Sequence, residues 1–125
     1  MRTVNKNVNS RKRLLDYLER EKYLRTKKVR KAMEEVNREN FVRTSDKYLA
    51  YDDTPLSIGQ GQTISAPHMV AMMLEELDLK KTDNLLEIGS GCGYHAAVSS
   101  QMVSQVITIE RIRSLYDLAC ENLSE

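Results

Sequence analysis

Apolar residues recur at two spacings along the chain, and each spacing predicts a different kind of element. Helical spacing over residues 11–21 gathers one apolar side, made of Leu14, Leu15, Tyr17 and Leu18. Thr26 is a suitable N-cap for a second helix, whose apolar side carries Val29, Met33 and Val36. Two short helices alone bury little surface, so we expect this pair to pack against another part of the fold.

Helical spacing is lost between residues 37 and 64. Residues 37–54 are polar and rich in turn formers, which predicts irregular structure up to Pro55. Residues 56–64 hold two glycines among polar residues, and they predict a shaped loop or a short strand and loop. A helix is then expected from Pro67, with Ser65 able to cap it and with a buried stripe of Val70, Met73, Leu74 and Leu77.

The last third of the chain alternates short β-branched runs with helical segments. Parallel strands are predicted near residues 84–88 and 106–109, the first of them buried, and helices over 94–102 and 113–123. This order indicates an α/β fold, with the first half of an open parallel sheet preceded by helices. We therefore expect a helical region over residues 1–55 and, over 56–125, a loop followed by half of a sheet domain.

Composition is that of an ordinary globular chain, and its charge is unevenly spread. The 125 residues are 41% hydrophobic and 30% charged, no apolar run is long enough to span a membrane, and residues 1–10 hold no signal-peptide core, so we expect a cytoplasmic protein. Residues 1–31 hold 12 Lys and Arg against 3 Asp and Glu, while the remainder has a balance of −8. This asymmetry can mark nucleic-acid contact, but solvated basic helix faces explain it better.

A glycine-rich turn joins the first predicted strand to the helix that follows it. Gly89, Gly91 and Gly93 come just after Glu87, and glycines let a backbone turn sharply and let a ligand approach closely. The following helix offers unpaired N–H groups to an anion or carboxylate. Glu110 follows Gly93 by 17 residues, at the end of the second strand, where an acid can accept hydrogen bonds from ribose hydroxyls.

Three known glycine motifs can be compared with this turn. A nicotinamide dinucleotide site needs a glycine where Tyr94 stands, and a P-loop needs a Gly-Lys-Ser/Thr run that does not follow. The pattern E-x-G-x-G-x-G instead resembles motif I of class I methyltransferases. That resemblance implies that Glu87 and the glycine backbone hold S-adenosylmethionine and that Glu110 holds its ribose. A strand residue bonded to loop amides, for Glu87, and an acid at a helix N-terminus, for Glu110, are the structural alternatives.

Other reactive side chains near the turn carry little functional signal. Cys92 occupies a small-residue position in the turn and Cys120 lies in a predicted helix, and neither belongs to a CxxC or histidine-containing cluster. We expect both to be free thiols and expect no metal site. His95, on the helix after the turn, is expected to be non-catalytic.

A longer resemblance covers residues 53–69, which read DTPLSIGQGQTISAPHM. This run resembles the signature loop of protein-L-isoaspartate O-methyltransferases, and the similarity extends over roughly residues 26–125. It implies methylation of the free carboxylate of L-isoaspartyl residues in damaged proteins, which begins their repair. Because a carboxylate is already ionised at pH 7, this transfer needs alignment more than it needs a general base.

The same resemblance implies roles for individual residues of the loop. Ser65 matches the active-site serine, whose hydroxyl would orient the substrate carboxylate; helix capping is its alternative role. Gln62, Thr63 and Ile64 would lie along the cofactor and substrate, or pack as ordinary loop residues. His68 would contact cofactor or substrate, or would be a hydrogen-bonded structural histidine.

The resemblance also implies that the C-terminal half of the sheet is missing from this chain. We expect the 125-residue chain alone to bind S-adenosylmethionine weakly and to show little turnover. An open strand edge exposes unpaired backbone groups, so self-association through the incomplete sheet is expected. The rival interpretations are another class I methyltransferase fragment, acting on a small molecule or RNA, and a non-catalytic basic binding module.

Overall fold

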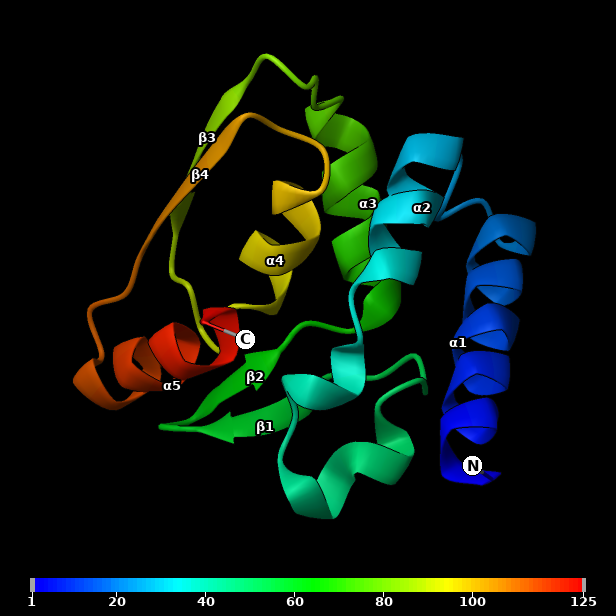
Figure 1. Cartoon of the computed structure of the whole chain (residues 1–125), viewed down its shortest axis with the longest axis horizontal. Helices are drawn as coiled ribbons and strands as arrows, with labels where there is room; N and C mark the ends of the chain where they lie inside the picture. The colour runs from blue at the N-terminus through cyan, green and yellow to red at the C-terminus, as the bar shows by residue number, and fades with distance from the viewer. Residues whose placement is uncertain (1, 125) are drawn as a thin grey trace.

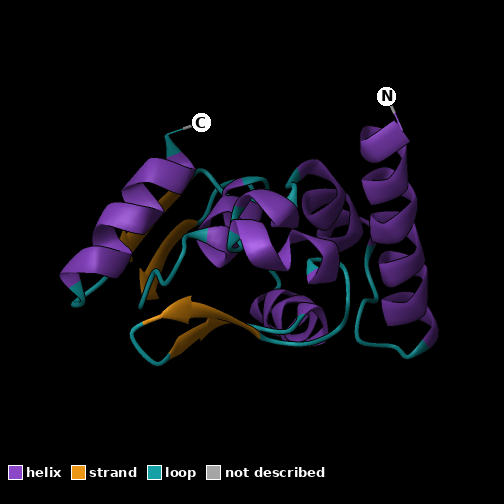
Figure 2. Ribbon diagram, turned by 90° about the horizontal axis from the view of Figure 1, so that it is seen from below, coloured by secondary structure: helices purple, strands orange, loops and turns teal. Residues whose placement is uncertain are grey.

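The computed structural model describes the backbone of residues 2–124 and the side chains of residues 7–124. Helix α1 and the parallel strands β3 and β4 lie at opposite ends of the molecule, with α2, α3 and α4 between them (Figures 1 and 2). No helix in this described part of the chain combines the length and apolarity needed to cross a membrane.

The first two helices pack side by side through the apolar sides that the sequence predicts. Helix α1 spans Arg2–Arg20 and α2 spans Lys27–Glu35. Leu15, Leu18 and Val29 are almost fully buried, and the Thr26 hydroxyl accepts a hydrogen bond from the Val29 N–H at 3.4 Å, which confirms the predicted N-cap. Helix α1 begins well before residue 11; the prediction missed its first turns because Val4 and Val8 are their only apolar residues, too few to show a helical stripe.

Short turns and a hairpin follow the helical pair. Two 3₁₀ turns, η1 at Arg38–Asn40 and η2 at Thr44–Leu49, fill the segment predicted to be irregular. Strands β1 (Leu56–Gly59) and β2 (Gln62–Ile64) pair antiparallel, so the predicted short strand and loop is a β-hairpin. Gln60 and Gly61 both have positive φ at its tip, the backbone that a tight two-residue hairpin turn requires.

Helix α3 spans Pro67–Leu77, and its first turn differs from the prediction. Pro67 stands in that turn as expected. The N-cap residue is Ala66, which makes no side-chain capping hydrogen bond, so the capping role predicted for Ser65 is wrong. The helix begins one residue too late for the Ser65 side chain to reach its free amides. Val70 and Leu74 are buried, whereas Met73 and Leu77 are 38% and 47% exposed, so only half of the predicted stripe is covered.

Strands β3 (Asn84–Ile88) and β4 (Gln105–Ile109) form a parallel pair, which confirms the predicted α/β class. Helix α4 (Tyr94–Ser100) makes the crossover and α5 (Arg113–Leu123) follows β4. Alternate residues of both strands are half-buried on the side of α4, and the others are exposed. The prediction of a buried β3 is therefore wrong, because no described element covers its outer face, where Ile88 is 72% exposed.

One contiguous core connects the helical region to the rest of the fold. It includes Leu18 and Val29 from the first two helices together with Val70, Leu74 and Val98 from α3 and α4. Helices and hairpin are therefore held against α4, and α4 holds one face of the strand pair. The division of the chain at residue 55 stays a prediction.

Candidate functional site

The turn between β3 and α4 follows a left-handed backbone path that glycine adopts without strain. Gly89, Gly91 and Gly93 all have positive φ, with values of 89°, 54° and 90°. The N–H groups of Gly89 and Ser90 donate to the Ile109 carbonyl at 2.8 and 3.1 Å, which fixes the turn against the end of β4. A Cβ on Gly93 would lie 3.0 Å from the Leu123 side chain, so this glycine also permits close packing of α5.

Glu110 binds the backbone of the same turn from the end of β4. Its carboxylate accepts hydrogen bonds from the Ile112 N–H at 3.0 Å and from the Gly91 N–H at 2.9 Å. These backbone donors lower the pKa of Glu110 below its ordinary value, the Ile112 bond most. The carboxylate is therefore held ionised beside the turn, with lone pairs left for other donors.

Glu87 supplies a second carboxylate near the turn, and its side chain lies on the side of the sheet that α4 covers. Glu87 and Thr108 are directly opposite in the parallel register, and the Thr108 hydroxyl donates to the Glu87 carboxylate at 2.5 Å. The Ser90 and Thr108 hydroxyl oxygens are 2.7 Å apart. His95 Nδ1 lies 3.2 Å from the second Glu87 oxygen.

A cavity of about 320 Å³ joins the hairpin to the glycine turn. Ser65 lines it together with Gly89 and Gly91, and Glu87 and His95 line another part of its wall. Among the described residues the Ser65 hydroxyl has no hydrogen-bond partner, so it is free to meet a group inside the cavity. Thr63 and Ile64 also line this cavity, next to Ser65 in the chain.

A second cavity of about 510 Å³ lies on the other side of the turn. Gln62 and Thr63 line it from the hairpin, and Glu110 lines it from the end of β4. Gly89 and Gly91 belong to the walls of both cavities, as does Thr63. The glycine turn therefore separates two spaces that together could hold an elongated ligand, with Ser65 and Glu110 at different ends.

Two predicted site residues lie outside these two cavities. The His68 N–H donates to the Asp53 carboxylate at 2.9 Å and His68 Nδ1 lies 3.0 Å from the same oxygen, while its ring meets the Tyr23 ring at a tilted angle of 43°. Asp53 therefore satisfies an amide of the first turn of α3, where Ser65 was expected to act. Gly93 contacts Leu123 and lines neither of the two cavities.

Sequence reasoning missed a buried cluster that anchors the exit of the glycine turn. The Arg38 guanidinium carbon lies 5.1 Å from the centre of the Tyr94 ring, and Phe41 meets the same ring edge-on. Arg38 is only 1% exposed, and burial lowers the pKa of its guanidinium. A lone arginine in a polar segment gives no sequence signal of burial, so only the folded arrangement reveals this contact.

The two cysteines are free thiols, as predicted. Burial raises the pKa of the Cys92 thiol, so this side chain fills space in the turn and is a poor nucleophile. No cluster of three or more potential metal ligands is found among the described residues. The groups that line the adjoining cavities include two carboxylates, Glu87 and Glu110, and the Ser65 hydroxyl, which could align a ligand.

Comparison with known proteins agrees with this arrangement. A family model described as Protein-L-isoaspartate(D-aspartate) O-methyltransferase matches residues 9–125. The protein-L-isoaspartate O-methyltransferase of Hyperthermus butylicus is 51% identical over 124 residues, covering 91% of this chain and 52% of the relative. That of Thermosipho melanesiensis is 52% identical over 103 residues, covering 80% and 52%.

A solved structure matches as well. A Plasmodium falciparum structure, described as a protein-L-isoaspartate O-methyltransferase in complex with S-adenosyl-L-homocysteine, superposes with a TM-score of 0.79 at 32% identity. The match covers 90% of this chain and 54% of that one. The chain thus spans about half the length of the proteins it matches. The family resemblance seen in residues 53–69 is confirmed: the chain belongs to the protein-L-isoaspartate O-methyltransferase family.

Proposed function

We propose that this chain carries the methyl-donor site and the substrate-aligning serine of a protein-L-isoaspartate O-methyltransferase. The observation that supports this most directly is the cavity shared by Ser65, Gly89 and Gly91. A free hydroxyl beside a glycine turn can orient an acceptor carboxylate close to a bound cofactor. The substrate class would be proteins and peptides that contain L-isoaspartyl residues.

The groups around the two cavities fit S-adenosylmethionine. The ionised Glu110 has acceptor capacity for ribose hydroxyls, and Glu87 offers negative charge to the ammonium of the methionine part. Gln62, Thr63 and Ile64 would lie along the ligand from the hairpin side. When bound, this cofactor supplies an activated methyl group whose leaving group is a neutral thioether. The acceptor carboxylate needs no deprotonation, so the protein has only to bind and orient the two reactants.

Ser65 would act by orientation. Its hydroxyl can donate one hydrogen bond to a carboxylate oxygen and leave the other oxygen free to accept the methyl group. A nucleophilic role is not supported, since the two histidines pair with carboxylates elsewhere: His68 with Asp53 and His95 with Glu87. For His68 the structural role has the better support, because it lines neither cavity.

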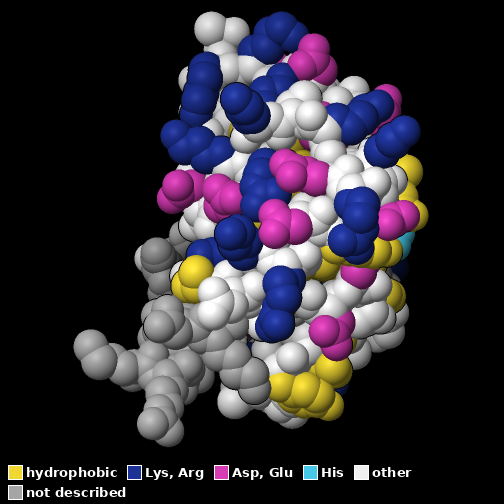
Figure 3. All heavy atoms as spheres, turned by 90° about the vertical axis from the view of Figure 1, so that its right-hand side faces the viewer, with side chains coloured by type: hydrophobic (Ala, Val, Ile, Leu, Met, Phe, Trp, Pro, Cys, Tyr) yellow, Lys and Arg dark blue, Asp and Glu magenta, His cyan; other side chains and the backbone are white. Residues whose placement is uncertain are grey.

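The rival interpretations receive less support. Arg30 on α2 lies 2.9 Å from the carboxylates of Asp16, Glu19 and Glu34. Figure 3 shows acidic side chains lying between the basic ones on this side of the molecule, which does not favour nucleic-acid binding. The loop that contains Ser65 favours an isoaspartyl acceptor over a small molecule or RNA. A cytoplasmic location stays an expectation.

Because the chain spans about half of its relatives, we expect the 125 residues alone to bind the cofactor weakly and to turn over little. Titration with S-adenosyl-L-homocysteine, followed by backbone amide NMR, should shift the signals of Gly89 and Gly91 with a dissociation constant well above micromolar. Glu110→Ala should remove these shifts, and Glu121→Ala, on the exposed side of α5, should retain them. Unchanged glycine signals at millimolar ligand would contradict the proposed site.

A methyl-acceptor assay separates the candidate substrates. With labelled S-adenosylmethionine and concentrated protein, any base-labile methyl ester should form on an isoaspartyl peptide and not on the matched aspartyl peptide. Ser65→Ala should abolish that ester while leaving the cofactor-induced amide shifts in place. Label transferred to RNA, or equally to both peptides, would refute the isoaspartyl assignment. Micromolar calorimetric binding by a compact monomer would refute the expectation of weak binding.

A further inference from the structure

The Glu87 carboxylate is held at both of its oxygens by side chains that come from different elements. Thr108, on β4, donates to one oxygen at 2.5 Å, and His95, on α4, faces the other with Nδ1 at 3.2 Å. Glu87 and Thr108 lie on the half-buried face of the sheet, the face on the side of α4. Two attachments fix the carboxylate more closely than one, because each removes a rotation of the Glu87 side chain.

The two nitrogens of His95 have unequal surroundings, and this decides which one carries the proton. Nδ1 lies 3.2 Å from a Glu87 carboxylate oxygen and 3.4 Å from the Ser99 hydroxyl oxygen, whereas Nε2 is buried with no hydrogen-bond partner among the described residues. A proton on Nε2 would be a buried donor without an acceptor, and a bare Nδ1 would turn its lone pair toward those of the Glu87 oxygen. The geometry therefore favours a proton on Nδ1, directed at Glu87.

We propose that His95 is a positioning residue, which holds Glu87 so that its negative charge meets the ammonium of a ligand's amino-acid part. The proposal rests on the function proposed above and deepens it. Both residues line the same cavity, and the remaining lone pairs of the Glu87 oxygens can accept from an ammonium.

Packing alone explains His95 less well. Its side chain is 21% exposed and lies on a helix whose buried positions are Tyr94, Ala96, Val98 and Ser99, so an apolar residue would fill the same space. The second histidine, His68, also pairs with a carboxylate, but its Asp53 partner additionally binds an α3 amide and neither lines the cavity. Of the two pairs, only the His95 pair lines the cavity that Ser65 shares with the glycine turn.

The test begins with the ring itself. Long-range ¹H–¹⁵N NMR of the 125-residue chain reads the protonation state of His95 without any ligand. We expect the proton on Nδ1, and Glu87→Gln should shift the proton towards Nε2. If His95 carries its proton on Nε2 in the wild-type chain, the proposal is wrong, whether or not the cofactor binds.

The second measurement compares two ligands by amide NMR titration: S-adenosyl-L-homocysteine, and 5′-methylthioadenosine, which lacks the amino-acid part. His95→Leu should weaken the binding of S-adenosyl-L-homocysteine by roughly tenfold, the value of one charge-assisted hydrogen bond. It should change the affinity for 5′-methylthioadenosine by less than about twofold. His95→Asn should restore most of the affinity, because its amide can donate from nearly the same place as Nδ1. Ser100→Ala, exposed on the same helix, should change neither ligand.

The outcomes separate the proposal from the function on which it rests. Equal weakening of both ligands by His95→Leu would indicate a general structural role and overturn the positioning role. A wild-type chain that binds neither ligand would refute the proposed cofactor site, while the ring measurement still decides whether His95 and Glu87 form the pair.

Discussion

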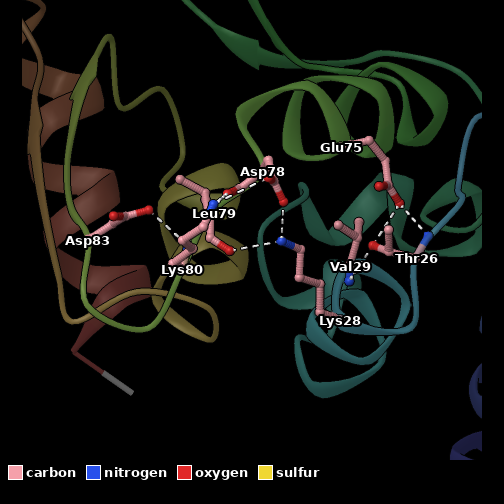
Figure 4. Close-up of polar contacts among 8 residues, drawn as sticks. All are labelled: Thr26, Lys28, Val29, Glu75, Asp78, Leu79, Lys80 and Asp83. Atoms are coloured by element: carbon pink, nitrogen blue, oxygen red, sulfur yellow. Dashed lines mark hydrogen bonds and ion pairs between the residues drawn. The ribbon is translucent and has the colours of Figure 1, made fainter.

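Burial of side chains differs between the contact of α2 with α3, called the seam here, and the outer face of the strand pair β3–β4. At the seam, the Glu75 carboxylate accepts from the Thr26 backbone N–H at 2.8 Å and from the Thr26 hydroxyl at 3.1 Å (Figure 4). It also accepts from the Arg25 backbone N–H at 2.8 Å. Leu74 beside it is fully buried. On the outer face of the strands, Leu86 and Ile88 are 60% and 72% exposed.

The difference shows which part of the fold is complete in itself. Every polar group named at the seam has a partner, and its apolar groups are covered by neighbouring helices. The strand pair is covered on one face only, although strands of parallel sheets are ordinarily buried on both. Stability should therefore concentrate in the helical layer, and the sheet should gain most from any partner.

The largest difference in unfolding free energy is expected between two leucine-to-alanine variants, one in the core and one on the outer face of the strands. Leu74→Ala should lower the free energy of unfolding by about 3 kcal/mol, since it opens a cavity in the core, while Leu86→Ala should change it by less than about 0.5 kcal/mol. Urea denaturation followed by circular dichroism measures both. A large loss from Leu86→Ala would show that the outer face is covered in solution, which would remove the contrast.

The polar half of the seam can be tested with two adjacent acids. Glu75→Gln should cost about 2 kcal/mol of unfolding free energy, because a neutral amide oxygen replaces a buried carboxylate that binds three donors. Glu76→Gln, which loses only an exposed ion pair with Arg25, should cost less than about 0.5 kcal/mol. Similar unfolding free energies for the two variants, measured by the same urea denaturation, would show that burial at the seam adds no stability.

The uncovered face predicts weak self-association between two copies of the chain. Its exposed members, Leu86, Ile88, Ile107 and Ile109, carry no charge, so two such faces can meet without repulsion. Sedimentation velocity at rising concentration should detect association, and Ile107→Lys should abolish it with little change in unfolding free energy. Met72→Lys, on the exposed side of α3, provides the control. A monomer at all concentrations would contradict the expectation.

The smallest effect expected is a pH response at the glycine turn. The pKa of Glu110 is lowered in the folded chain, so its contribution is complete above the ordinary value of 4.5 and is lost as pH falls through the lower, folded pKa. The Gly91 amide signal should therefore titrate with a midpoint below pH 4.5, and Glu110→Gln should remove that titration. A midpoint above 4.5 would mean that the carboxylate is not bound to the turn.

Local pattern was enough to predict most elements and the family. Helix α5 begins and ends where its apolar spacing predicts, at Arg113 and Leu123, and Thr26 caps α2 as expected. The exposure of Met73, Leu77 and Ile88 was not predictable, because hydrophobic spacing shows which side of an element is apolar and not whether anything covers it.

Contacts that depend on register or on distant loops were also beyond the sequence. Glu87 and Thr108 each stand one residue before the end of their strands, yet only the parallel register makes them partners. Asp53 binds the first turn of α3 from 15 positions away, a contact that no helix-capping rule predicts. The position of Glu110, after the second strand and beside the glycine turn, was predictable because strand, glycine turn and acid form one local motif.

The Asp53–His68 contact has a further consequence for the hairpin. These residues lie on either side of β1 and β2, so their hydrogen bond closes a loop of the chain that contains Gln62 and Ser65. Closing the loop reduces the conformations open to the hairpin before any ligand arrives. An incoming cofactor then meets a segment that is already restricted, and less of its binding energy is lost in ordering that segment.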